Sequence, residues 1–142
     1  AGAGRDERFY VLEDASCNLS PDGWARRVVD TFQKWGADRV VAEKNFGGAM
    51  VEAVLRTASK NLPITMVTAS RGKIARAEPV AALYEQGKVS HCGVFNALED
   101  QMCAMTGAGY VGEGSPDRAD ALVWAMSELN YTGYRNTLDN LV

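Results

Sequence analysis

The sequence has 142 residues, of which 46% are apolar and 23% are charged, and its formal net charge is -3. These values predict one globular domain with a real core and exclude a disordered chain. No apolar run approaches the ~20 residues of a membrane helix, and no leader marks the chain for export. Three scattered cysteines without a C-x-x-C pair suit the reducing cytoplasm and indicate neither a disulfide framework nor a zinc site. The charge predicts no general attraction to a polyanion, so any nucleic-acid surface must be a local basic patch.

The first half of the chain alternates strands with helices. The opening AGAGRDE has the character of a strand end and turn, and residues 8–14 (RFYVLED) are aromatic and β-branched, as in a strand. Ser20-Pro21-Asp22 is a capped helix start, and Gly36 is the expected stop. An apolar stripe of Trp24, Val28, Phe32 and Trp35 is predicted to pack inward along this helix.

Two further crossover elements follow. Residues 38–43 are predicted as the second strand, and a helix begins at Gly47 or Gly48 and ends near Ser59. Its buried side is expected to contain Met50, Val54 and Leu55. Residues 63–69 (PITMVTA) are the third strand. This alternation predicts crossover units and a partly parallel sheet.

The second half is mainly helical. A helix is predicted over residues 73–86, with a break or kink at Pro79, followed by a short edge strand over residues 88–91. Residues 96–105 are expected to be helical with Asn96 as the cap, and the glycine-rich residues 106–115 to be a flexible loop. Ser115-Pro116-Asp117 then starts a last helix. Its predicted buried face contains Ala119, Leu122, Met126 and Leu129, before a polar, frayed tail from about residue 130.

Motif searches exclude several kinds of site. The chain has neither a G-x-x-x-x-G-K-[ST] phosphate loop nor a G-x-G-x-x-G after a strand. Its single histidine, His91, is interpreted as structural or solvated, so histidine-based catalysis is not expected. Carboxylates remain as the candidates for chemistry.

Glu43 ends an apolar strand, where ligands bind in open α/β sheets, although a solvated strand terminus is an equally good interpretation of this stretch alone. Asp117 and Asp120 are three residues apart and share one helix face. An acid at position 117 is ordinary at a helix N-terminus, whereas Asp120 lies a turn further in, among small and apolar neighbours. If Asp120 faces Glu43, the carboxylates would repel each other, and a divalent cation such as Mg²⁺ or Mn²⁺ would remove that cost.

Three cations follow the third strand in the segment SRGKIAR. Arg71, Lys73 and Arg76 lie on the carboxyl-end side, where a nucleic-acid backbone would need to run. A solvated helix start is the alternative. Cations at a helix N-terminus oppose the helix dipole, however, so another group is expected to favour them there.

Together these segments resemble the C-terminal nuclease domain of the tailed-phage terminase large subunit. The resemblance covers nearly the whole chain and rests on five stretches in register: SPDGWARRVVDTFQKWGADRVVAEKNFGG, MVEAVLRT, SRGKIARAEPVAALYEQGKV, LEDQMCAM and SPDRADALVWA. It implies an α/β, ribonuclease-H-like mixed sheet flanked by helices, as one domain over residues 1–142. It also implies a metal-dependent endonuclease that cuts concatemeric double-stranded DNA in the cytoplasm of a bacterial host.

The resemblance also assigns residues and partners. Glu43 matches the family's acid after the central strand, and Asp117 and Asp120 match the acids that open the last helix, with Asp120 slightly favoured as the closer ligand. They would hold Mg²⁺ or Mn²⁺, two ions in an intact domain. Arg71, Lys73 and Arg76 are the candidate DNA contacts. The implied partners are double-stranded DNA, an upstream ATPase domain, the small terminase subunit and the portal.

The chain departs from the family pattern at its start. The family's first acid is an aspartate on an N-terminal strand, and no residue here matches it, so the domain is expected to be N-terminally truncated. A site short of one ligand should bind metal weakly and be impaired in cutting. The alternatives are therefore a non-catalytic module that binds DNA or the packaging motor, or a resolvase or ribonuclease H relative. A small-molecule-binding α/β domain is the least favoured alternative.

Overall fold

The structure is a computed structural model that describes residues 1–44 and 48–139, with residues 132–139 described by their backbone alone. The chain divides into two compact units, and each is described here by itself. The first unit contains residues 1–14 and 71–142, and the second contains residues 15–70. The prediction of one domain over residues 1–142 stays a prediction.

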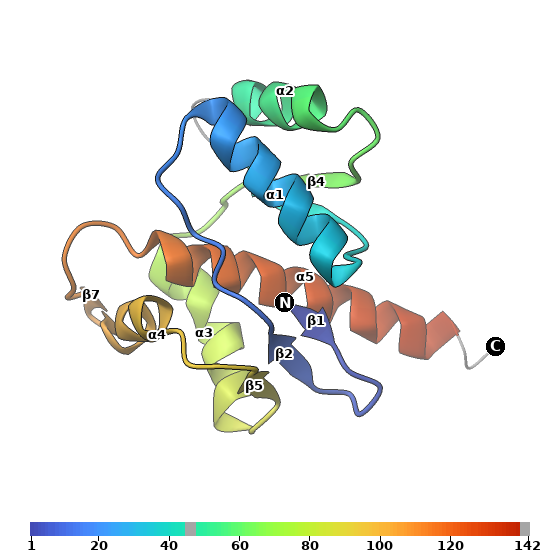
Figure 1. Cartoon of the computed structure of the whole chain (residues 1–142). Coiled ribbons are helices and arrows are strands. Elements are labelled where there is room, and N and C mark those ends of the chain that lie inside the picture. Colours follow the sequence, from blue (N-terminus) through green and yellow to red (C-terminus); the bar gives the residue numbers. More distant parts are fainter. Residues whose placement is uncertain (45–47, 140–142) are drawn as a thin grey trace. The chain divides into compact units, whose positions relative to one another are not determined.

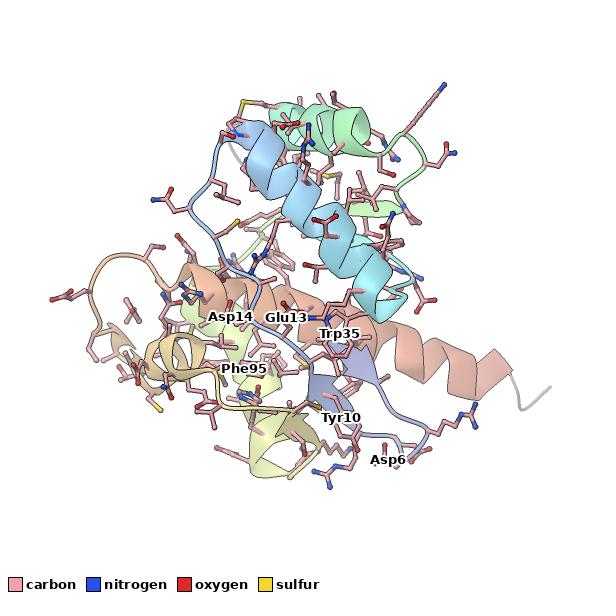
Figure 2. All side chains as sticks on the ribbon, viewed as in Figure 1. Asp6, Tyr10, Glu13, Asp14, Trp35 and Phe95 are labelled. Carbon is pink, nitrogen blue, oxygen red and sulfur yellow. The ribbon has the colours of Figure 1, made fainter. Side chains whose placement is uncertain are left out.

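The first unit is built on a small mixed sheet of three strands. Its strands are β1 (Gly2–Ala3), β2 (Phe9–Val11) and β5 (Val89–His91), in the order β1-β2-β5. The pair β1 and β2 is antiparallel, whereas β2 and β5 are parallel and pair from Phe9↔Val89 to Val11↔His91. At the β1–β2 turn, the Tyr10 hydroxyl donates to Asp6 Oδ2 at 2.6 Å, and the two side chains lie side by side in Figure 2.

Helices pack around this sheet and complete the core of the first unit. They are α3 (Lys73–Glu85), α4 (Asn96–Cys103) and α5 (Asp117–Asp139), and α5 contacts both α3 and α4 (Figure 1). A short hairpin of β6 (Met105–Thr106) and β7 (Gly109–Tyr110) lies between α4 and α5 in the sequence. The buried core contains Phe9, Val11, Val80, Leu83, Val89, Leu98, Leu122, Val123 and Met126. The predicted inner face of the last helix is confirmed, since Ala119, Leu122 and Met126 are buried and Leu129 packs against the core.

The second unit pairs two parallel strands with two helices. Strands β3 (Val40–Glu43) and β4 (Ile64–Val67) are joined by α2 (Gly48–Ala58), and α1 (Pro21–Trp35) packs on α2. The Ser20 side chain caps α1, and Gly36 ends it with φ +55°, a left-handed conformation that glycine adopts without strain. Both ends of this helix are therefore as predicted.

The predicted burial of two residues of the second unit is wrong. Met50 is 60% exposed, because α2 turns the stripe Val51, Val54, Leu55 and Ala58 toward the core instead. Trp35 is also exposed, and the Lys34 ammonium lies 5.2 Å from its ring centroid. As the last residue of α1, Trp35 extends the apolar period past the point where the core ends.

Four local predictions for the second half differ from the structure. The break that was one of the two expectations at Pro79 does not occur, because proline removes only one helical hydrogen bond of α3 and the flanking Val80 is held in the core. A kink at Pro79 stays a prediction. Phe95, not Asn96, is the N-cap of α4. The glycine-rich segment contains the β6–β7 hairpin and is not a loop throughout. Helix α5 continues to Asp139, past residue 130 where a frayed tail was expected.

Candidate nuclease site

Glu43 is the last residue of β3 in the second unit. It pairs in register with Val67 of β4, and the Lys44 amide continues the ladder by donating to the Val67 carbonyl at 2.6 Å. Both strands run the same way, so the half-buried Glu43 lies at the carboxyl end of a parallel pair, as its sequence position predicted. The neighbouring residues 45–47, including Gly47, lie outside the described residues.

Asp117 and Asp120 lie in the first turn of α5 in the first unit, and one lysine contacts both. Lys73 Nζ is 3.0 Å from Asp117 Oδ1, 3.5 Å from Asp120 Oδ2 and 2.8 Å from the Ser115 hydroxyl oxygen. Lys73 is the first residue of α3, so the N-terminal turns of two helices meet here. The two aspartates differ in environment, since the side chain of Asp117 is 78% exposed and that of Asp120 only 7%.

Arg76 binds the second oxygen of the buried aspartate. Its Nη2 is 2.6 Å from Asp120 Oδ1, and its Nη1 donates to the Arg71 carbonyl at 2.7 Å. The guanidinium also lies 4.8 Å from the centroid of the Trp124 ring, a cation–π contact. Its side chain is only 10% exposed. Arg76 therefore fixes Asp120 and leaves little surface for a DNA phosphate.

Gln101 of α4 caps the helix that carries the acids. Its Oε1 accepts hydrogen bonds from the amides of Arg118 at 2.9 Å and Ala119 at 3.2 Å. These are two of the N–H groups that a helix start leaves without a partner. Arg118 is held in addition by Asp14, with Nη1 of Arg118 2.7 Å from Oδ2 of Asp14. Sequence reasoning missed Gln101, because it precedes the helix by 16 residues and has no local capping pattern.

The contacts of this cluster shift its pKa values in the expected directions. The hydrogen bond from Ser115, followed by that from Lys73, lowers the pKa of Asp117 below its usual 3.8. Burial lowers the pKa of Lys73, but the hydrogen bond to Asp117 and the attraction of Asp120 outweigh it and raise that pKa above 10.5. Lys73 and Asp117 are therefore both ionised near neutral pH. The cations at the start of α3 are thus compensated by the carboxylates of α5.

The structure brings four of the six predicted residues together in the first unit: Lys73, Arg76, Asp117 and Asp120. Arg71 contributes only its backbone carbonyl, which accepts a hydrogen bond from Arg76, and the residue itself is exposed. Glu43 belongs to the second unit, so its approach to the aspartates stays a prediction. Among the side chains of residues 1–44 and 48–131, no three histidine, cysteine or acidic groups gather as they would around a metal ion.

The donor atoms nevertheless suit a hard divalent cation. Asp117 and Asp120 present carboxylate oxygens around one point, which is the ligand chemistry that Mg²⁺ and Mn²⁺ prefer. The ammonium of Lys73 occupies that point, so these oxygens already bind a positive charge there. The residues therefore fit a metal ion, provided that the lysine gives up its place.

His91 belongs to a separate hydrogen-bonded chain in the first unit. Its Nε2 is 2.8 Å from the Tyr84 hydroxyl, and its Nδ1 is 2.8 Å from Glu99 Oε1. Glu99 also accepts a hydrogen bond from the Phe95 amide at the start of α4, and the centroid of the Phe95 ring lies 5.7 Å from that of the imidazole. Burial, followed by the charge of Glu99, raises the pKa of Tyr84 to about 12, so its hydroxyl stays protonated. These contacts give His91 a structural role, one of the two that the sequence indicated.

The described residues form an α/β architecture of helices and small sheets, which is consistent with a ribonuclease-H-like domain. Residues 3–129 match the family model described as the terminase RNaseH-like domain, and the chain belongs to that family. The family is one of terminase nuclease domains and implies metal-dependent chemistry and a part in phage DNA packaging. No curated protein and no solved structure matches the chain. In the described part of the chain, no helix is long and apolar enough to cross a membrane.

Proposed function

We propose that this domain is the metal-dependent endonuclease of a phage DNA-packaging terminase, and that it hydrolyses phosphodiester bonds of concatemeric double-stranded DNA in the host cytoplasm. The family membership and the acid–base cluster at the start of α5 carry the proposal together. The family makes an ATPase domain, a small terminase subunit and a portal the expected partners.

In this proposal, Glu43, Asp117 and Asp120 hold the metal. Bound Mg²⁺ or Mn²⁺, as two ions, would activate a water and stabilise the leaving oxygen of an in-line displacement. Arg76 holds Asp120 in one orientation through Nη2, which keeps a buried carboxylate in a fixed position for a metal ion. Ser115 and Gln101 hold the first turn of α5, so that Asp117 stays beside Asp120.

The cations divide into two roles. Arg71 is exposed and Lys73 is 36% exposed, so both can reach a phosphate from the surface. Arg76 is already engaged by Asp120, Trp124 and a backbone carbonyl. We therefore expect loss of the Arg71 side chain to weaken DNA binding and to leave the other properties of the domain unchanged, because phosphate contacts act mainly through charge.

Nicking of supercoiled plasmid in Mn²⁺ tests the activity. The parent chain is compared with Glu43→Gln, Asp120→Asn and the control Glu85→Gln, which changes an exposed glutamate of α3. We expect nicking by the parent and the control, and a loss of about a hundredfold or more in the two site variants. Full nicking by Glu43→Gln would refute the role of Glu43, and nicking retained by both variants would refute the site.

A second candidate function is a non-catalytic DNA-binding or motor-binding module. One observation favours it: both carboxylate oxygens of Asp120 are taken by cations of the chain itself. It predicts a gel shift with double-stranded DNA that Arg71→Ala weakens, without nicking in Mn²⁺. Preferential cutting of branched DNA or RNA–DNA hybrids would instead indicate a resolvase or ribonuclease H relative.

A further inference from the structure

Lys73 occupies a position that resembles a cation site. Three oxygens of the segment that opens α5 surround its ammonium: the Ser115 hydroxyl at 2.8 Å, Asp117 Oδ1 at 3.0 Å and Asp120 Oδ2 at 3.5 Å. Two of these oxygens belong to the proposed metal ligands. We infer that Lys73 is an internal counter-ion that competes with a divalent metal ion for Asp117 and Asp120, and that it leaves them when the ion binds. This inference rests on the proposed function and concerns the regulation of its site.

The helix start explains why a competing cation is needed in the absence of metal. The side chain of Asp120 is only 7% exposed, and a buried carboxylate without a compensating charge is costly. Gly72, the N-cap of α3, supplies no side-chain cap, and a lysine at the next residue opposes the helix dipole. The ion pairs with Asp117 and Asp120 offset both costs at once.

Lys73 and Arg76 differ in their freedom to move. Arg76 is 10% exposed and is held by Asp120, by the Arg71 carbonyl and by the Trp124 ring. Lys73 is 36% exposed, and its contacts come from the exposed Ser115 and Asp117 together with Asp120. A long, flexible lysine side chain can swing into solvent without opening the core. Arg76 therefore stays on Asp120 Oδ1, and Lys73 is the cation that can yield Oδ2.

Charge decides the competition. With Lys73 and Arg76 in place, two positive charges balance the two aspartates. A divalent ion at the same oxygens would lie within a few ångströms of the ammonium and be repelled by it. Departure of Lys73 removes this repulsion and frees Asp117 Oδ1 and Asp120 Oδ2 as ligands. The displaced ammonium, next to the metal site, would then be available for a DNA phosphate.

Mn²⁺ binding to the full chain, followed by the electron paramagnetic resonance signal of the free ion, tests the inference without any need for cutting. The variants are Lys73→Met, which keeps the length without the charge, and Lys73→Gln as a second neutral variant. Lys88→Met is the control, because Lys88 is an exposed lysine of the same unit. We expect both Lys73 variants to bind Mn²⁺ about tenfold or more tightly than the parent, since one unit charge is removed beside the ion. Lys88→Met should bind like the parent, and Asp120→Asn should abolish the gain.

Chemical labelling of lysines gives a second readout. Acetylation of the parent chain, followed by mass spectrometry, should label Lys73 faster when Mn²⁺ is present, because the ammonium has left its oxygen partners. The labelling rate of Lys88 should stay the same.

The outcomes separate this inference from the proposed function. Mn²⁺ binding that depends on Asp120 but is no tighter in Lys73→Met, or is weaker, would overturn the inference and leave the nuclease proposal standing. Tighter binding in Lys73→Met without nicking by any chain would support the inference and refute the nuclease. If neither the parent nor Lys73→Met binds Mn²⁺, the inference and the metal-dependent mechanism are both refuted.

Discussion

The Asp120–Arg76 pair makes the sharpest prediction on stability. Asp120→Ala would remove the carboxylate and leave a guanidinium that is 10% exposed without its 2.6 Å partner. Removing one partner of a buried ion pair typically costs about 3–5 kcal/mol. Arg76 would keep the Arg71 carbonyl and the Trp124 ring, so we expect the low end of that range, about 3 kcal/mol.

A double-mutant cycle isolates the pair from the rest of the site. Asp120→Ala, Arg76→Met and the double variant should show a coupling of about 2 kcal/mol, because the double variant leaves no unpaired buried charge. Native-state hydrogen exchange of the α3 and α5 amides in increasing urea measures the free energy of unfolding of the first unit.

An exposed pair provides the matched control. Arg26 Nε and Asp22 Oδ2 are 2.9 Å apart in the second unit, but their side chains are 72% and 69% exposed. Asp22→Ala should therefore cost less than about 1 kcal/mol when the α1 amides are followed. A cost below 1 kcal/mol for Asp120→Ala, or additive effects in its cycle, would refute the reasoning that burial makes this pair strong.

Three further predictions concern the first unit. Met126 is fully buried, so Met126→Ala should destabilise the unit by about 3 kcal/mol in urea denaturation, and a cost below 1 kcal/mol would contradict its place in the core. Gln101→Ala should cost about 1 kcal/mol and speed exchange of the first α5 amides, whereas unchanged exchange would argue against the cap. The phenol of Tyr84 should ionise near pH 12 in an ultraviolet titration of the folded chain, as a phase that Tyr84→Phe lacks. Its pKa is raised by folding, so the stability that it contributes is present below pH 10 and lost as the pH rises toward 12, and a Tyr84 phase near pH 10 would refute this.

The boundaries of the main elements could be predicted because their signals are local. Ser20 and Gly36 bound α1 through a side-chain cap and a left-handed glycine, and both lie within a turn of the residues they affect. The position of Glu43 at a strand end follows from the apolar run before it. Met50 and Trp35 were misplaced because an apolar period continues beyond the area that a small core can cover.

The acids could be identified from sequence, but their partners could not. Asp117 and Asp120 share a helix face by spacing alone, and the unfavourable position of Lys73 at a helix start predicted a compensating group. The identity of that group depends on the contact between α3 and α5, which lie more than 40 residues apart in the sequence. The cap likewise depends on Gln101 of α4 lying against the start of α5.

The sequence by itself determined the class of fold, the family pattern and the residue types of the site, because these depend on periodicity, capping and motif order. Only the tertiary structure decided that Arg76 is buried against Asp120 and Trp124 while Lys73 bridges Asp117 and Asp120 near the surface. The sequence alone does not distinguish the burial of Lys73 from that of Arg76, because both are basic residues about one helical turn apart. Burial fixes Arg76 on Asp120, whereas the ion pairs of Lys73 lie nearer the surface and cost less to separate, since the cost of separating charges depends on the water around them.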